Sequence, residues 1–329
     1  MTYNKEDKVK KLTLTIIFIG VLTMNLNALP KVLLHLDINK TLIAEDLTTN
    51  KTMEYTISNA LAEKTVYKWS DDLKPMSYRD YVSCVLAPGD KVKQREIVAS
   101  FIPFLETTDY SERARVRKIY DQVMQKMQDA YLVPSFVRLI QVMQEEDIPF
   151  RIILRTFGGD IRIGKITQEI NKLLKRGAIE HSGRFTNGQL TITDETNCIQ
   201  TFEKVDEIYR YFRDAQGHIA IQDDWNRWHE DDERARSAKP FIFDPKDKQI
   251  VSIFFDDNIN EDTGSEYNII YPMDTNGSPK ALDKLLNRNV FVADIIEAIL
   301  DENYFVDRVN QSLSESRLFN AFSRNCSST

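Results

Sequence analysis

The sequence predicts an α/β fold, in which a parallel sheet lies between layers of helices and a mainly helical segment is inserted after the first strand. Three short and almost wholly apolar runs carry this prediction, because strands covered on both faces lose the polar alternation of half-exposed strands. The runs are residues 31–36, 150–154 and 249–255. Amphipathic helical stretches lie between them, and strands that alternate with helices are typical of a parallel sheet.

The composition fits a large globular core with an additional module. The chain has 329 residues, of which 42% are hydrophobic and 28% charged, with 11 Gly and 10 Pro, and this excludes disordered and fibrous proteins. A net charge of -7 without a clustered basic stretch argues against a nucleic-acid partner. Cys84, Cys198 and Cys326 are too few and too scattered for a disulfide framework or a zinc knuckle.

The first 28 residues differ from the rest of the chain. Lysines at positions 5, 8, 10 and 11 precede an apolar run, residues 12–24, and Ala28 offers a small residue for cleavage. This three-part form predicts a signal peptide over residues 1–28 and a secreted or periplasmic protein. The run is too short to span a bilayer comfortably, so we expect no stable membrane span. The alternative is a cytoplasmic protein in which the run is a strand or helix of the fold.

The first strand, residues 31–36, ends at Asp37 and is followed at once by a polar turn. A cluster of turn residues, 48–51, then separates two short segments with strand character, which predicts a hairpin over residues 47–61.

A helical cap is predicted over residues 61–130, inserted into a core formed by residues 29–60 and 131–320, with a flexible tail over residues 321–329. The cap prediction depends on two apolar stripes at helical spacing. Their members are Tyr78, Tyr81, Val82 and Val85, and Val116, Ile119, Tyr120 and Val123.

A second segment has the same pattern as the first, an apolar strand that ends in polar residues. A helix over residues 135–146 precedes the apolar strand 150–154, which runs into Arg155 and Thr156. The next helix points its N-terminus toward Thr156, and a helix N-terminus favours an anion.

The remaining elements are shorter. Asn187-Gly188 is the preferred pair for a two-residue hairpin turn. A strand over residues 218–221 leads into an acidic, tryptophan-containing stretch that is either a pocket wall or a solvated loop. The strand 249–255 runs into Asp256 and Asp257, with a short strand before it, an edge strand over residues 267–271 after it, and a helical region at the C-terminal end.

Three strand ends therefore carry polar side chains. The carboxyl ends of parallel strands meet at one edge of a sheet, so Asp37, Thr156 and the pair Asp256 and Asp257 are expected to converge. Several carboxylates at one point repel each other unless a cation lies between them. Oxygen ligands without His or Cys suit Mg²⁺ rather than zinc.

The same residues suggest phosphoryl chemistry. Magnesium bound by few carboxylates keeps positions open for a substrate phosphate, and the Thr156 hydroxyl and the Lys239 ammonium supply hydrogen-bond donors to it. Asp37 would attack phosphorus and form an aspartyl phosphate, which divides one difficult displacement into two easier steps.

At these positions the sequence resembles the haloacid dehalogenase superfamily of aspartate-nucleophile hydrolases. The first motif, Asp-x-Asp-x-Thr after an apolar strand, is similar to LLHLDINKT, with Asp37 as nucleophile and Thr41 as the closing threonine. The second motif falls on Thr156 in IILRT and the fourth on Asp256 and Asp257 in IFFDDN. The third-motif lysine is Lys239 in AKPF, with Lys165 as a weaker rival.

The resemblance implies a Rossmann-like core with a substrate-selecting cap and a Mg²⁺-dependent phosphohydrolase acting on a small phosphorylated substrate. It also implies the metal ligands, namely Asp37, the Asn39 backbone carbonyl and Asp256, with Asp257 acting directly or through water. Thr156 and Lys239 would bind the phosphate. Transfer of the phosphoryl group to another acceptor would use the same residues.

One residue departs from the family pattern. The family's phosphatases carry a second aspartate, the general acid and base, where this chain has Asn39. An amide does not exchange a proton usefully near neutral pH, so a contribution of about 10²- to 10⁴-fold is missing from this catalytic position. The consequence is a slow phosphatase, an enzyme with its proton carrier elsewhere, or a catalytically degenerate binding protein. His35 is the nearest titratable side chain, and its place within the strand favours a buried structural histidine.

Overall fold

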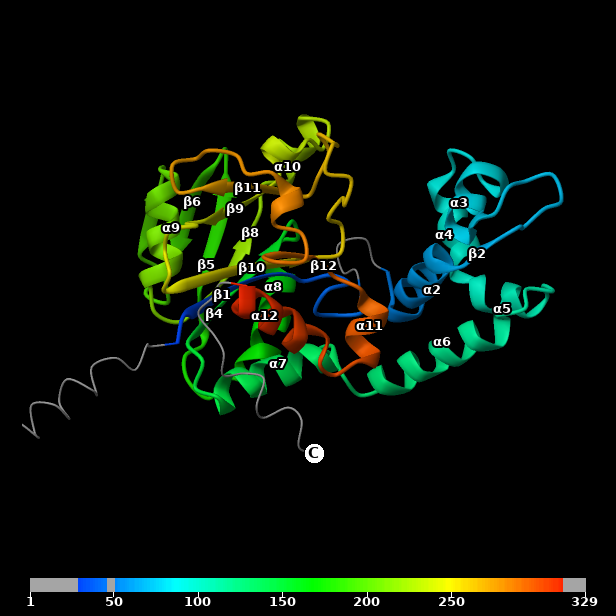
Figure 1. Cartoon of the computed structure of the whole chain (residues 1–329), viewed down its shortest axis with the longest axis horizontal. Coiled ribbons are helices and arrows are strands. Elements are labelled where there is room, and N and C mark those ends of the chain that lie inside the picture. The colour runs from blue at the N-terminus through cyan, green and yellow to red at the C-terminus, as the bar shows by residue number, and fades with distance from the viewer. Residues whose placement is uncertain (1–28, 46–50, 316–329) are drawn as a thin grey trace, which may run out of the picture.

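A computed structural model describes residues 29–45 and 51–315 and has an α/β architecture. Its centre is a mostly parallel eight-stranded sheet, in the order β12-β10-β1-β4-β8-β5-β6-β7, flanked by helices in a Rossmann-like arrangement (Figure 1). The predicted signal peptide, the turn residues 46–50 and the predicted tail lie outside the described residues. In the described part, none of the helices has the length and apolar composition that a membrane crossing needs.

The three apolar runs are the three adjacent strands at the centre of the sheet, which confirms the prediction that they lie side by side. They are β1 (Lys31–Asp37), β4 (Phe150–Thr156) and β10 (Ile250–Asp256). β1 pairs in parallel with β10 on one side and with β4 on the other. The parallel part of the sheet also includes β8 (His218–Gln222) and β12 (Val290–Val292).

Both faces of these strands are covered, which explains why their sequences lack alternation. In β1, Val32 and Leu34 belong to the apolar cluster that contains Phe136 of α7, whereas Leu33 belongs to the cluster that contains Phe212 of α9. The helices of the core are α7 (Pro134–Glu145), α8 (Asp160–Asn171), α9 (Val205–Asp214), α11 (Ile295–Leu300) and α12 (Tyr304–Glu315).

The far side of the sheet is extended by a three-stranded meander, β5 (Ile179–Thr186), β6 (Gln189–Thr193) and β7 (Ile199–Phe202). β5 runs parallel to β8, and the pairs β5–β6 and β6–β7 are antiparallel. Asn187 and Gly188 join β5 to β6 with φ angles of 52° and 84°, the left-handed conformations that a type I′ turn requires. The predicted hairpin at this pair is confirmed.

A helical part projects from one side of the core, next to α11 (Figure 1). It consists of α2 (Met53–Lys64), α3 (Tyr78–Tyr81), the π-helix η2 (Val82–Leu86), α4 (Lys91–Ala99), α5 (Phe101–Glu106) and α6 (Arg113–Met127), with the short strands β2 (Val66–Tyr67) and β3 (Met76–Ser77). Lys64 forms an ion pair with Asp294 at the start of α11, and the Lys126 ammonium donates to the Leu300 carbonyl at its end. Both ends of the helical part are thus attached to α11.

The hairpin predicted over residues 47–61 is wrong for the residues described, because α2 begins at Met53. Thr52 caps this helix by accepting a hydrogen bond from the Tyr55 amide, and Ile57 and Leu61 are buried one turn apart. The boundary predicted between residues 60 and 61 falls inside this helix.

A second, two-stranded parallel sheet consists of β9 (Lys239–Phe243) and β11 (Ile270–Asp274). The strand predicted over residues 267–271 therefore begins later and pairs with β9. The acidic stretch after β8 forms α10 (Trp225–Glu230) instead of a loop, and two 3₁₀ turns, η3 (Ala235–Ser237) and η4 (Leu282–Lys284), complete the described elements.

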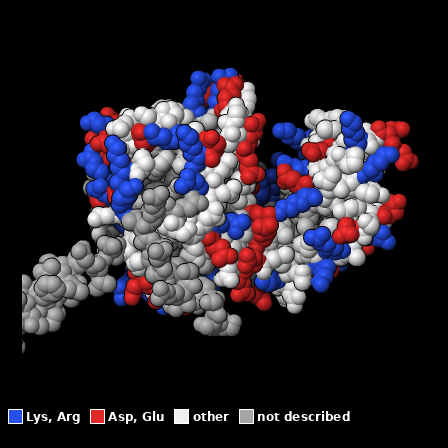
Figure 2. All heavy atoms as spheres, in the orientation of Figure 1, with Lys and Arg blue, Asp and Glu red and all other residues white. Residues whose placement is uncertain are grey.

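Charges are unevenly spread over the face shown in Figure 2. Basic side chains gather over the α9 side of the core and acidic ones over the region of α11, whereas both kinds are mixed over the helical part.

Candidate active site

Three carboxylates converge where two central strands end. Asp37 ends β1 and Asp256 ends the adjacent strand β10, because Leu36 and Phe255 are paired in register. One carboxylate oxygen of each of Asp37, Asp256 and Asp257 lies within 4.8 Å of the others. Asp37 is 5% exposed and Asp256 is fully buried, so these charges have little water to solvate them.

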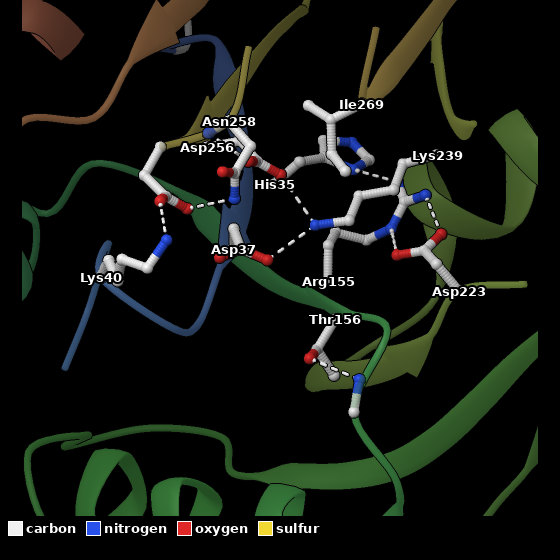
Figure 3. Close-up of polar contacts among 12 residues, drawn as sticks. His35, Asp37, Lys40, Arg155, Thr156, Asp223, Lys239, Asp256, Asn258 and Ile269 are labelled. Atoms are coloured by element: carbon white, nitrogen blue, oxygen red, sulfur yellow. Dashed lines mark hydrogen bonds and ion pairs between the residues drawn. The ribbon is translucent and has the colours of Figure 1, made fainter. Parts of the chain in front are cut away.

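Lys239 lies between two of these carboxylates (Figure 3). Its Nζ atom donates to Asp37 Oδ1 at 2.6 Å and to Asp256 Oδ2 at 2.7 Å. The lysine is 2% exposed. Of the two lysines that the sequence offered, Lys239 is therefore the one beside Asp37, whereas Lys165 lies on α8 with its ammonium 3.9 Å from the centre of the Tyr131 ring.

Two residues that the sequence analysis did not single out complete the contacts of the acidic pair. The Lys40 ammonium donates to Asp257 Oδ2 at 2.9 Å. The Asn258 amide N–H donates to Asp256 Oδ1, and the Asn258 side chain donates to Asp257 Oδ1. Lys40 lies inside the first motif and Asn258 directly follows the last one. Their closeness in sequence to the motif aspartates is the signal by which both residues could have been predicted.

The electrostatics of the cluster reflect burial and crowding. Burial, together with the nearby Asp256 and Asp257 charges, raises the pKa of Asp37 well above its ordinary value despite the opposing effect of Lys239. Burial raises the pKa of Asp257 to about 6, against the effect of Lys40. Burial alone would lower the pKa of Lys239, but the Asp256 and Asp37 carboxylates outweigh it and raise that pKa. Three carboxylates and two ammonium groups leave an excess of negative charge that a cation would neutralise.

Thr156 lies at the end of β4, beside β1. Asp37 is paired with Arg155, so Thr156 lies one residue further along the neighbouring strand. Its Oγ1 atom accepts a hydrogen bond of 2.9 Å from the Gly158 amide, which holds the turn that leads into α8. Thr156 and the start of this helix therefore lie at the same sheet edge as the carboxylates.

Asn39 lies two residues beyond Asp37, in a tight turn. Hydrogen bonds from the Lys40 amide to the Ile43 carbonyl and from the Leu42 amide to the Ile38 carbonyl close this turn. Asn39 itself forms a parallel bridge with Ile43. Asn39 thus opens the turn that follows Asp37, at the sequence position where the resemblance implies a general acid.

His35 is fully buried and does not belong to the carboxylate cluster. Its ring stacks on Phe254, and its Nδ1 atom lies 3.3 Å from a guanidinium nitrogen of Arg155. Burial and the charges of Arg155 and Arg151 lower the pKa of His35 well below its usual range, which keeps the ring neutral. The interpretation as a buried structural histidine agrees with this geometry.

An aromatic wall borders the site. Phe157 stacks on Trp228 of α10, with the ring centres 5.1 Å apart, and the Lys239 ammonium lies 5.0 Å from the centre of the Phe157 ring. On the β8 side, Phe157, Gln222 and Trp225 contribute to a cavity of about 550 Å³. The acidic, tryptophan-containing stretch is thus a wall of this region, which was one of the two interpretations of its sequence.

No protein-family model, curated protein or solved structure matches the chain. The resemblance to the haloacid dehalogenase superfamily accordingly depends on the four motifs and stays a prediction.

Proposed function

We propose that the protein is a Mg²⁺-dependent phosphohydrolase that cleaves a phosphomonoester through an aspartyl phosphate on Asp37. The single observation that carries this proposal is the convergence of three aspartates at adjacent strand ends, with Lys239 bridging Asp37 and Asp256. A nucleophilic carboxylate and a buried ammonium at one point are the groups that phosphoryl transfer requires.

The donor set fits magnesium. Asp37, Asp256 and Asp257 offer only oxygen, among the described residues no His or Cys completes the cluster, and the local charge is negative. With the Asn39 backbone carbonyl, these residues would hold the ion. When bound, Mg²⁺ would neutralise the phosphate oxygens and draw the phosphoryl group toward Asp37.

In the first step an Asp37 oxygen forms a bond to phosphorus while the bond from phosphorus to the ester oxygen breaks. Lys239 and the Thr156 hydroxyl would donate to the equatorial phosphate oxygens, where negative charge is spread in the transition state. In the second step water attacks phosphorus and releases inorganic phosphate and the free Asp37 carboxylate. The leaving oxygen must acquire a proton in the first step, and the attacking water must lose one in the second.

Asn39 determines the expected range of substrates. Its amide does not supply that proton, so esters of acidic alcohols, which leave without protonation, should react faster than esters of ordinary alcohols. The helical part over α2 to α6 would act as the cap that restricts access, and the cavity beside Phe157 would receive part of the leaving group.

A second function is favoured by the same residue. With Asn39 in place of an acid, the fold would bind Mg²⁺ and a phosphorylated ligand without turning it over, as a secreted binding protein. A mass measurement of the mature chain tests the export on which the word secreted depends. A chain that begins near Leu29 supports export, and an intact Met1 contradicts it.

The experiment that separates the two functions is a panel of phosphomonoesters, assayed with and without Mg²⁺, on the natural chain, Asp37→Asn and Asn39→Asp. The phosphohydrolase requires Mg²⁺-dependent release of phosphate that Asp37→Asn abolishes. Asn39→Asp should accelerate cleavage of esters with poor leaving groups by about 10²-fold or more. Activity that survives Asp37→Asn would falsify the nucleophile assignment, and Mg²⁺ binding without any turnover would favour the binding protein.

A further inference from the structure

Lys239 is the first residue of β9, a strand that is not part of the central sheet. β9 is hydrogen-bonded to β11 in a separate two-stranded sheet, and among the described residues no ladder joins β9 to β1 or β10. The Lys239 amide donates to Ile269, which precedes β11. The distance between the Lys239 ammonium and the Asp37 carboxylate therefore depends on contacts between the two sheets.

Arg155 provides such a contact. It is fully buried on β4, and its Nη1 atom donates to the Pro240 carbonyl on β9 at 2.9 Å. The same nitrogen lies 3.3 Å from His35 Nδ1 on β1. One guanidinium thus touches the backbone next to Lys239 and a side chain two residues before Asp37. Figure 3 shows Arg155 beside His35 and Asp223.

Asp223 fixes the orientation of this guanidinium. Its two carboxylate oxygens accept from Arg155 Nε at 3.0 Å and from Nη2 at 2.5 Å, the parallel two-bond arrangement that sets the plane of an arginine. The Asp223 amide in turn donates to the Thr156 carbonyl at 2.7 Å. With the rings of Phe185 and Phe254 5.2 and 5.5 Å from the guanidinium carbon, the group is held on all sides.

We infer that Arg155, oriented by Asp223, is a positioning residue that sets the place of the Lys239 ammonium relative to the Asp37 nucleophile. This inference rests on the proposed phosphohydrolase function. Among the described residues, the Arg155 guanidinium has no hydrogen bond to the three site aspartates, and Arg155 meets Asp37 only as its backbone partner in the sheet. A change of the Arg155 side chain therefore acts on the reaction through β9 and through His35 on β1. Arg155 is next to both proposed phosphate-binding residues. It directly precedes Thr156 in the sequence, and it donates to Pro240, which directly follows Lys239.

The same strand carries a matched control. Arg151 is also fully buried on β4, but at the other end, where its Nη1 donates to the carbonyls of Tyr211 and Phe212 on α9. In the described part of the chain, Arg151 has no hydrogen bond to β9. Arg151→Lys and Arg155→Lys are therefore the same chemical change in the same strand, and only the second removes a tie between the two sheets.

The test compares kcat, KM and Mg²⁺ half-saturation for p-nitrophenyl phosphate in the two lysine variants, well below their melting temperatures. A lysine keeps the charge beside Asp223 but lacks the fork that reaches Pro240 at the same time. We expect Arg155→Lys to lower kcat about 10²-fold relative to Arg151→Lys, the size of effect that a displacement of about 1 Å produces. Mg²⁺ half-saturation should change little. Equal kcat values in the two variants would overturn the inference.

A second variant keeps the test decisive if Arg155→Lys does not fold. In Arg155→Met with Asp223→Leu, apolar groups of similar volume replace the buried pair, a change that is often neutral for stability. We expect a folded protein with kcat reduced as in Arg155→Lys. Full kcat in this folded double variant would contradict a positioning role.

Crystal structures of Arg155→Lys and Arg151→Lys give a readout that needs no turnover. We expect the distance from Lys239 Nζ to Asp37 Oδ1 to exceed hydrogen-bond range in the first and to stay near 2.6 Å in the second. If the natural chain proves inactive, the phosphohydrolase proposal fails, and these distances still decide the role of Arg155. An unchanged distance in Arg155→Lys overturns it.

Discussion

The two ends of the central sheet both bury charged side chains, but they use them differently. At the carboxyl end, the Lys239 ammonium contacts the carboxylates of Asp37 and Asp256. At the amino end, Lys31 and Arg151 donate to main-chain carbonyls instead.

The carbonyls bound at the amino end are those of Tyr211, Phe212 and Arg213, in the last turn of α9. The end of a helix leaves such carbonyls without partners and carries partial negative charge, so cations stabilise it. At the amino end, the helix terminus and the Tyr211 ring offset the charge of Arg151, although within the described residues its Nε and Nη2 atoms have no hydrogen-bond partner. The carboxyl end instead keeps an excess of carboxylates over ammonium groups, and crowded carboxylates mark the end at which a cation is expected.

The largest expected effect is on turnover. Asp37→Asn at the carboxyl end removes the nucleophile, so phosphate release should fall at least about 10³-fold, equivalent to about 4 kcal/mol in the barrier. Asp247→Asn at the amino side, where Asp247 accepts from the Tyr209 hydroxyl, should leave the rate unchanged. Phosphate release with saturating Mg²⁺ measures both, and similar losses in the two variants would remove the distinction between the ends.

The next effect is on stability. Lys239→Met leaves buried carboxylates without their ammonium partner, and we expect a loss of about 3–5 kcal/mol in the free energy of unfolding. Added Mg²⁺ should restore part of this loss by supplying the missing positive charge. Lys31→Met, which removes one hydrogen bond to the end of α9, should cost about 1 kcal/mol and should not respond to Mg²⁺. Urea unfolding with and without Mg²⁺ tests the contrast, which a Mg²⁺ response in both variants would contradict.

The third effect is a pH dependence of the free energy of unfolding, which His218 at the amino end of the sheet should cause. His218 accepts a hydrogen bond from the Ile152 amide, and burial, helped by Arg151 and Lys31, lowers the pKa of His218 from 6.5 to about 4. The unfolded chain therefore binds a proton at this position between pH 6.5 and 4 and the folded chain does not, so stability falls as the pH falls. A difference of about 2.5 between the two pKa values corresponds to about 3 kcal/mol at most.

His218→Gln keeps an acceptor for the Ile152 amide but does not titrate. As the pH is lowered from 7 to 4, the natural chain should therefore lose stability relative to this variant, as measured by the free energy of unfolding. Urea unfolding at several pH values measures the difference. A difference that is constant with pH would show that His218 titrates normally in the folded protein.

The smallest effect separates the two lysines of the carboxyl end. Lys40 is half-buried at the rim and pairs with Asp257, whereas Lys239 is buried between Asp37 and Asp256. Lys40→Met should change the free energy of unfolding by about 1 kcal/mol or less, and the change should shrink in high salt. A loss as large as that of Lys239→Met would mean that the rim ion pair holds the cluster together.

The sequence predicted the structure correctly where a short segment shows by its own pattern whether it is buried or forms a turn. Continuous apolar runs predicted β1, β4 and β10, because both faces of these strands are covered. Polar residues at the ends of these strands predicted the convergence of Asp37 with Asp256 and Asp257, because parallel strands end at one edge. The Asn187-Gly188 turn was equally readable, since few residue pairs adopt its conformation.

The sequence failed where distant segments compete with local preference. Turn residues before Thr52 suggested a hairpin, but the buried stripe on α2 and its cap make a helix more stable there. The predicted edge strand after β10 instead joins β9 in a sheet of its own. Neither outcome is encoded in a short window, because the partner that decides it lies elsewhere in the chain.

By itself, then, the sequence determined which residues end the central strands and so which carboxylates meet. Only the tertiary structure decided what surrounds them. Lys239 reaches Asp37 from a separate sheet, 202 positions away in sequence, and Arg155 pairs with Asp223 across β4 and β8. The physical reason is that side-chain periodicity is a local property of a strand, whereas the place of a charge depends on how whole elements pack and on which partner compensates for its burial.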